Sequence, residues 1–235
     1  MKVILLSAGF GYRLRPLTNK TPKCLVTING VPLLKIWIDR LSNHGLGPFL
    51  VNTHYLKDQV ERFVYSLNNS KVTLKHEEVL LGTAGTLISN IDFFEGEDGL
   101  LIHADNYCSA DFKEFIEAHN NRPKKCLLTM MTFQTEAPKT CGILELDGNN
   151  VVKAIHEKVD CPPGRLANGA IYILSSELLF YLQNQNKSLS DFSTEVLPKL
   201  IGKIYTYETS ETFIDIGTKE AYDRANKVAN LTDIS

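Results

Sequence analysis

Two kinds of segment alternate along the first 133 residues or so. Continuous apolar runs such as Val3–Leu6, which end at small residues and glycine, predict strands buried on both faces, as in a parallel sheet. Between these runs, the apolar residues recur at helical spacing. The predicted strands are 3–6, 48–52, 72–75, 99–103 and 125–133, and the predicted helices are 33–41, 56–67, 81–91 and 111–119. This alternation predicts an α/β fold with a mainly parallel, doubly wound sheet.

The pattern changes after residue 133. The turn residues Asp-Gly-Asn-Asn at 147–150 separate apolar segments at 142–145 and 151–156, which predicts a hairpin. Further strands are expected at 169–174, 204–206 and 213–216, and further helices at 192–200 and 219–228. The second half of the chain is therefore expected to add a small antiparallel annex to the sheet.

The composition excludes several classes of protein. Of 235 residues, 43% are hydrophobic and 22% charged, so the chain can bury a core without metal or disulfide staples. The formal net charge of −2 gives no indication of a nucleic-acid or anionic-membrane partner. Five cysteines without a CxxC pair argue against a zinc site or a disulfide framework. The apolar run near the N-terminus is too short for a signal peptide or a membrane span, so a cytoplasmic protein is expected.

The first predicted strand runs into a glycine-containing loop with a nearby cation. Gly9 and Gly11 allow the backbone to approach a phosphate closely, and Arg13 adds a fork of donors suited to phosphate oxygens. Lys23 follows ten residues later, so a compact loop could bring both cations to one set of phosphates. Leu14 stands where the dinucleotide-binding fingerprint has its third glycine, and no Gly-Lys-Ser/Thr ends the loop as in a Walker A motif. These observations disfavour a Rossmann dehydrogenase and a P-loop protein.

The whole stretch LSAGFGYRLRPLTNKTPKCLVTINGVPLL (6–34) resembles the signature of sugar-1-phosphate nucleotidylyltransferases. Tyr12 departs from the Thr or Ser that is usual there. The resemblance implies a Rossmann-like fold and a reaction that joins a nucleoside triphosphate to a sugar 1-phosphate and releases pyrophosphate. It also implies that Arg13 and Lys23 are catalytic and that Ala8, Gly9 and Gly11 bind the nucleotide.

Further segments match the same family in the expected order. The stretch EEVLLGTAG (77–85) resembles its nucleobase-binding loop, with Leu80 where Pro is frequent, and implies base contacts by Glu77, Gly82 and Thr83. Asp105 follows the strand at 99–103, and a carboxylate at the carboxyl end of a buried strand is typical of an α/β site. Asp105 and Asp215 match the two aspartates that hold Mg²⁺ in the family, which is the implied cofactor.

The sugar side of the family pattern lies in the second half of the chain. Gly142, Glu157, Lys158 and Asn168 match residues that border the sugar or bind its phosphate. Cys141 replaces the usual Tyr. The resemblance thus predicts a single domain over residues 1–235, with a nucleotide-binding part at about 1–133, a sugar-binding part at about 134–218 and a terminal helix at 219–228. His103 is expected to pack beside the site rather than to take part in the reaction.

Base, sugar and assembly remain open at this point. An ionised Glu77 only accepts hydrogen bonds, which suits the N–H groups of guanine, whereas thymidylyl relatives tend to carry Gln. We therefore favour GTP with mannose or heptose 1-phosphate over uridylyl or thymidylyl transfer to a hexose or N-acetylmuramate phosphate. A glycosyltransferase is disfavoured because no Asp-x-Asp motif is present, and a regulatory paralogue that binds a nucleotide sugar because Arg13, Lys23 and both aspartates are kept. The expected partners are the two small substrates, and a homodimer is compatible with the sequence.

Overall fold

A computed structural model describes residues 1–185 and 188–232 of the chain. The contacts divide the chain into two compact units. The first unit contains Met1–Leu80, His103–Ser109 and the segment from Thr212 onward, and the second contains Leu81–Ile102 and Ala110–Glu211. The chain therefore leaves the first unit twice and returns to it twice.

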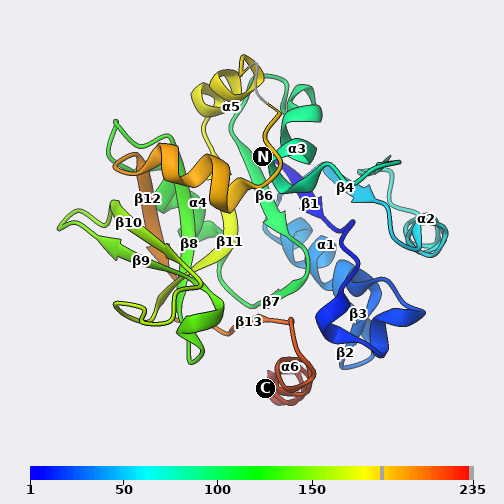
Figure 1. The fold of residues 1–235 in the computed structure, drawn as a ribbon. Helices are drawn as coiled ribbons and strands as arrows, with labels where there is room; N and C mark the ends of the chain where they lie inside the picture. The colour runs from blue at the N-terminus through cyan, green and yellow to red at the C-terminus, as the bar shows by residue number, and fades with distance from the viewer. Residues whose placement is uncertain (186–187, 233–235) are drawn as a thin grey trace. The chain divides into compact units, whose positions relative to one another are not determined.

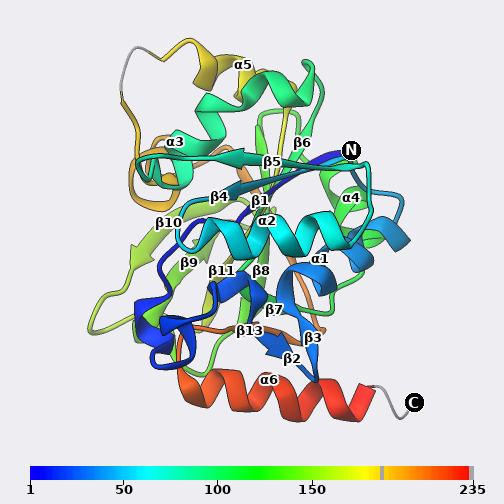
Figure 2. The same cartoon turned by 90° about the vertical axis from the view of Figure 1, so that its right-hand side faces the viewer.

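A parallel sheet forms the centre of the first unit. Its strands are β1 (Lys2–Leu6), β4 (Phe49–Thr53) and β5 (Val72–His76), and β4 pairs with both neighbours in parallel. The connections contain helices α1 (Leu33–Asn43) and α2 (Lys57–Ser66), which cover one face of these strands (Figure 1, Figure 2). Parallel strands need such crossovers, and they bring the carboxyl ends of β1, β4 and β5 to the same edge.

Two short antiparallel pairs complete the first unit. One is the hairpin of β2 (Thr27–Ile28) and β3 (Val31–Pro32), and the other pairs β7 (Asn106–Cys108) with β13 (Phe213–Asp215). The C-terminal helix α6 (Lys219–Thr232) lies beside the hairpin (Figure 2), where the Asn226 side chain accepts a hydrogen bond of 2.8 Å from the Asn29 N–H. This arrangement returns the end of the chain to the residues that follow β1.

The second unit contains a mixed set of strands. Strand β11 (Leu166–Leu174) runs antiparallel to β6 (Gly99–His103) and β8 (Leu128–Gln134), and β8 runs parallel to β12 (Ile204–Glu208). The hairpin of β9 (Gly142–Leu146) and β10 (Val152–Glu157) joins this set through β11. Its helices are α3 (Gly82–Ser89), α4 (Phe112–Asn120) and α5 (Ser176–Gln183).

Each unit has an apolar core of its own. Trp37 on α1 is fully buried in the first unit, and its indole N–H donates to the Asn106 carbonyl at 2.9 Å. In the second unit, Tyr172 and Phe192 are fully buried with their ring centroids 4.9 Å apart. Burying one such side chain contributes roughly 1.5–3 kcal/mol. No helix among residues 1–185 and 188–232 is long and apolar enough to cross a membrane.

The structure confirms the predicted α/β fold and corrects several boundaries. Strand β8 begins at Leu128, three residues later than expected, because the Cys126 N–H closes a turn on the Pro123 carbonyl. The helix expected at 192–200 is a π-helical turn followed by a 3-10 turn, in keeping with Pro198, which lacks an N–H for a regular helix. Helix α5 and the short strands β2, β3 and β7 were not predicted.

Candidate active site

The loop after β1 is held in place by a buried threonine. Gly11 has φ +65°, a conformation that favours glycine, and its carbonyl accepts a 2.8 Å hydrogen bond from the Thr18 hydroxyl. A Cβ on Gly11 would lie 3.0 Å from Thr18 Cγ2 and 3.2 Å from Lys23 Cβ. The second glycine of the motif therefore lets the loop lie directly against the segment that carries Lys23.

Lys23 is a buried cation paired with Asp105. Its Nζ lies 2.7 Å from Asp105 Oδ2, and only 9% of the lysine side chain is exposed, against 39% for the aspartate. Asp105 comes close to the glycine loop because the Ala104 N–H donates to the Leu6 carbonyl at the end of β1. Burial raises the pKa of the Asp105 carboxyl, but the charges of Lys23 and His103, together with the hydrogen bonds that the carboxylate accepts, outweigh it. The net pKa therefore lies below the usual range.

A second cation and carboxylate lie in the same unit. Arg13 Nη2 lies 3.9 Å from Asp215 Oδ2, and both side chains are substantially exposed. A Cβ on Gly217 would lie 2.7 Å from Arg13 Nη1, so the absence of a side chain there leaves room for the guanidinium. A cavity of about 240 Å³ is lined by Gly11, Tyr12, Arg13, Leu14, Lys23, Asp105 and Gly217. Two cations and an exposed glycine loop around one cavity make a site suited to phosphate groups.

The two aspartates of the first unit carry the kind of ligand atom that Mg²⁺ prefers. The register of β7 and β13 places Asp215 opposite Asn106, the residue that follows Asp105. Both carboxylate side chains are 39% exposed, so solvent and a ligand can reach them. Within the described residues, no group of three or more His, Cys, Asp or Glu side chains could hold a metal. Mg²⁺ commonly takes one or two carboxylates together with substrate phosphates, so the chemistry of these two side chains is compatible with that ion.

Glu77 lies in the first unit and is held by a residue that the sequence did not single out. Its carboxylate Oε1 accepts a 2.9 Å hydrogen bond from Asn52 Nδ2, and Asn52 Oδ1 in turn accepts a 2.6 Å hydrogen bond from the Ser7 N–H. Asn52 is 3% exposed and Glu77 5% exposed. A polar side chain at the carboxyl end of a buried strand was a signal that could have identified Asn52, as it did Asp105.

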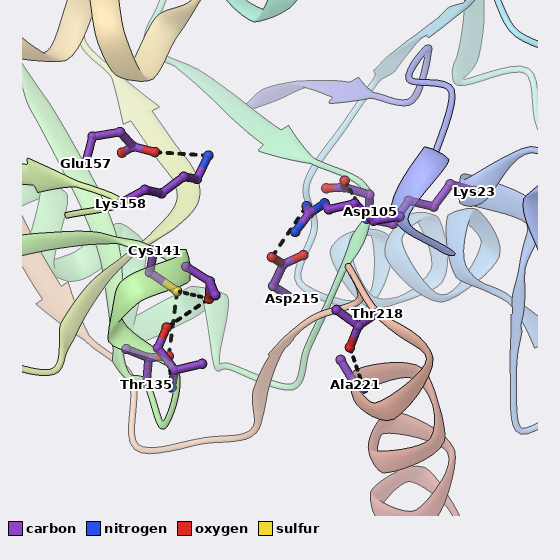
Figure 3. A network of polar contacts seen from close by, with 12 residues as sticks. Lys23, Asp105, Thr135, Cys141, Glu157, Lys158, Asp215, Thr218 and Ala221 are labelled. Atoms are coloured by element: carbon purple, nitrogen blue, oxygen red, sulfur yellow. Dashed lines mark hydrogen bonds and ion pairs between the residues drawn. The ribbon is translucent and has the colours of Figure 1, made fainter. Parts of the chain in front are cut away.

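The second unit brings together the residues predicted for the sugar phosphate. Gly142 and Glu157 are directly opposite in the β9–β10 hairpin, and a Cβ on Gly142 would lie 2.5 Å from Glu157 Oε2. Lys158 Nζ lies 3.2 Å from Glu157 Oε1 (Figure 3). The Lys158 N–H donates to the Cys141 carbonyl. The glycine therefore leaves the space that the Glu157 carboxylate occupies.

The remaining predicted residues of the second unit are tied into its framework. The Asn168 amide donates to the Tyr172 hydroxyl and accepts from the Ala170 N–H, both at 2.9 Å. The Thr83 hydroxyl accepts a 2.8 Å hydrogen bond from the Phe192 N–H. Gly82 has φ +76°, and a Cβ there would collide with the Ser190 carbonyl oxygen. These contacts order the start of α3 and the middle of β11.

Similarity to known proteins identifies the family of the chain. The family model described as nucleotidyl transferase matches residues 2–230. The chain belongs to the nucleotidyl transferase family. A Sulfolobus acidocaldarius protein, provisionally named mannose-1-phosphate guanyltransferase, is 31% identical over 96% of this chain and 62% of its own length. The chain thus spans about three fifths of that relative.

Two solved structures of nucleotidyl transferase relatives resemble the chain over nearly its whole length. A provisionally named glucose-1-phosphate thymidylyltransferase from Bacillus anthracis, in complex with a sucrose, has a TM-score of 0.84 and 25% identity, covering 97% of this chain and 95% of its own. HddC from Yersinia pseudotuberculosis, complexed with GMP-PN, has a TM-score of 0.82 and 28% identity, covering 97% and 99%. One of these two structures is thus named for thymidylyl transfer, and the other is a complex with GMP-PN.

One departure from the nucleotidyl transferase pattern has a structural explanation. The Tyr12 ring, at the position usual for Thr or Ser, stacks on Phe10 with centroids 5.0 Å apart, and the Arg15 guanidinium lies 4.5 Å from its centroid. Aromatic packing thus supports the loop at this position. Cys24, next to Lys23, is not a candidate nucleophile, because burial raises the pKa of its thiol to about 12.

Proposed function

We propose that this chain transfers a nucleotidyl group to a sugar 1-phosphate, with release of pyrophosphate, and that its preferred substrates are GTP and mannose or heptose 1-phosphate. The observation that carries the proposal is the cavity of the first unit, around which Arg13, Lys23 and Asp105 lie with the glycine loop. The family match over residues 2–230 supports it.

In the proposed reaction, a phosphate oxygen of the sugar 1-phosphate attacks the α-phosphorus of the triphosphate, and pyrophosphate leaves from the opposite side. The attacking oxygen is already anionic, so positioning and charge neutralisation supply the catalysis. We assign Lys23 to the α-phosphate and Arg13, with the loop at Gly9 and Gly11, to the departing pyrophosphate. Ala8, buried beside this loop, would contact the nucleotide through its backbone.

Magnesium is part of the proposal. Asp105 and Asp215 would hold the ion, which would offset the negative charge of the phosphates. The present partners of the two carboxylates, Lys23 and Arg13, are the same cations that we assign to the phosphates. The aspartates therefore also keep both cations oriented toward one region of the first unit.

For the sugar phosphate we assign Lys158 to the phosphate, and Glu157, Gly142 and Asn168 to the sugar. Lys158 has an exposed side chain paired with Glu157, as a residue that meets an incoming anion requires. For the base we assign Glu77, Gly82 and Thr83. The carboxylate of Glu77 accepts hydrogen bonds, which favours guanine, and the GMP-PN complex of HddC supports a guanine nucleotide.

The state of the cysteines bears on the compartment in which the chain works. Each of the five cysteines, all within the described residues, carries a free thiol. Free thiols fit a reducing compartment, and we propose the cytoplasm.

The deciding experiment measures pyrophosphate release with GTP, ATP, UTP and dTTP against a panel of sugar 1-phosphates in the presence of Mg²⁺. We expect turnover with GTP and mannose or heptose 1-phosphate. A higher rate with UTP or dTTP would overturn the assignment of the base while keeping the reaction. No release with any pair, together with intact binding of a nucleotide sugar, would replace the enzyme by a regulatory paralogue.

A further inference from the structure

The buried amide of Asn52 connects two parts of the first unit that have different roles in the proposed function. Its Oδ1 accepts from the N–H of Ser7, the residue after β1, and its Nδ2 donates to Oε1 of Glu77, the residue after β5. Asn52 itself is near the end of β4. A single series of hydrogen bonds therefore links the carboxyl ends of three neighbouring parallel strands.

The donor and acceptor of each hydrogen bond in this series are fixed by chemistry. A backbone N–H can only donate, so Asn52 must present its oxygen to Ser7 and its NH₂ group to position 77. Position 77 must then accept, which an ionised carboxylate does. The Glu77 backbone is anchored as well, because its N–H donates to the Thr53 carbonyl at 2.9 Å and its carbonyl lies 2.8 Å from His54 Nδ1.

We propose that Asn52 is a positioning residue that determines the hydrogen-bond polarity of residue 77, that is, whether residue 77 presents a donor or an acceptor to the nucleobase. This inference rests on the proposed function of Glu77. A carboxylate has about four acceptor sites on two oxygens, so it can accept from Asn52 and also from the N–H groups of guanine. A glutamine at position 77 would have to turn its oxygen to Asn52, and its NH₂ group would face the base. It would then suit the carbonyl oxygens of a pyrimidine.

The same reasoning predicts that the polarity can be reversed from position 52. In Asn52→Asp the residue still accepts from Ser7, but its second oxygen faces the Glu77 carboxylate, and the two like charges repel. Adding Glu77→Gln removes this repulsion, because the glutamine NH₂ group can donate to the carboxylate introduced at position 52. The glutamine oxygen then faces the base, so an acceptor for guanine is restored.

These variants give a test with a distinctive sign. We expect Glu77→Gln and Asn52→Asp each to lower the ratio of kcat/KM for GTP over dTTP about 10- to 100-fold, the range for one hydrogen bond to a charged group. We expect this ratio to be at least about tenfold higher in the double variant than in Glu77→Gln. Glu78→Gln makes the same chemical change at an exposed neighbour and should leave the ratio unchanged.

A ratio measured on one sample does not depend on the fraction of protein that is folded. Loss of packing alone would not produce recovery in the double variant. The inference would be overturned by an unchanged ratio in Glu77→Gln, or by a GTP preference in the double variant that is no higher than in Glu77→Gln. Dissociation constants of GTP and dTTP, from calorimetric titration of the wild type and the same four variants, give the ratio without turnover. If the wild type binds these nucleotides but releases no pyrophosphate with any pair, the proposed function fails while the binding ratios still decide the inference. If it binds neither, both fail.

Discussion

The Lys23–Asp105 pair allows a prediction in which stability and activity are affected to different extents. Lys23→Met keeps most of the aliphatic volume and removes the charge. At the 2.7 Å separation, the gross attraction is about 6 kcal/mol for an effective dielectric constant of about 20. Desolvation of the buried ammonium offsets most of it. The Asp105 side chain is 39% exposed, so water can solvate the carboxylate that is left behind.

We therefore expect a loss of about 2 kcal/mol in the free energy of unfolding, below the roughly 3–5 kcal/mol for a fully buried pair. For a chain of this length, that corresponds to a decrease in Tm of about 4–8 °C. The effect on kcat should be larger, about 10²- to 10³-fold, which is typical when one preorganised electrostatic donor is removed. The same loss in rate is expected for Lys23→Ala.

Thermal unfolding and pyrophosphate release, measured on the same preparations, check both numbers. Lys35→Met is the matched control, because Lys35 forms an exposed ion pair with Asp39 on α1, and such pairs contribute at most about 0.5 kcal/mol. Because the pKa of Asp105 is lowered in the folded protein, the pair stabilises the fold above that pKa. The stability gap between wild type and Lys23→Met should therefore shrink as the pH falls below about 4. A kcat within about fivefold of wild type would remove Lys23 from the catalytic machinery.

Three further changes have measurable outcomes. Burial lowers the pKa of His119, so the unfolded state binds more protons than the folded state, and the free energy of unfolding should decrease as the pH drops through about 6.5. In His119→Gln, urea unfolding between pH 5 and 7.5 should show a smaller decrease, because this histidine no longer contributes to it. Gly142→Ala should displace the Glu157 carboxylate and raise KM for the sugar phosphate about tenfold or more, which corresponds to the loss of one hydrogen bond. KM for the triphosphate should not change. Gly148→Ala is the control, because a Cβ there would lie in open space. EDTA should abolish turnover, and Asp215→Asn should raise the Mg²⁺ concentration for half-maximal rate; activity in EDTA equal to that in Mg²⁺ would contradict the metal assignment.

Most of the fold was predictable because the apolar pattern records which faces are buried. Strands β1 and β4 are buried along almost their whole length, and helices α1 and α2 bury one stripe, so both follow the rules for sequence periodicity. Helix α5 has no such stripe. Phe180 and Tyr181 are exposed between buried leucines, so its apolar residues do not mark one face. Its N-cap Ser175, which accepts from the Leu178 N–H, was the remaining signal.

The phosphate side of the candidate site was equally accessible, because its residues occupy a short stretch of sequence or the ends of strands. Lys23 lies ten residues from Arg13, and the turn closed by Thr18 and Gly11 brings their segments together. The roles assigned to Asp105 and Asp215 stay predictions, although the antiparallel register places the strand that carries Asp215 beside the strand that begins directly after Asp105. What the sequence could not supply was the pairing of each carboxylate with a particular cation, because that depends on side-chain geometry within the folded unit.

Local sequence is least informative about the residues that we assign to the nucleobase. The hydrogen bonds of Asn52 join residues separated by 45 and by 25 positions, and they exist only because three parallel strands end at one edge. The identity of residue 77 alone therefore does not determine whether it offers the ligand a donor or an acceptor. If residue 77 is a glutamine, residue 52 determines which end of its amide faces the ligand. It follows that Glu or Gln at this position predicts the base only while Asn occupies position 52. A chain with Asp at position 52 and Gln at position 77 should present guanine with an acceptor, although a rule based on residue 77 alone would assign it to a pyrimidine.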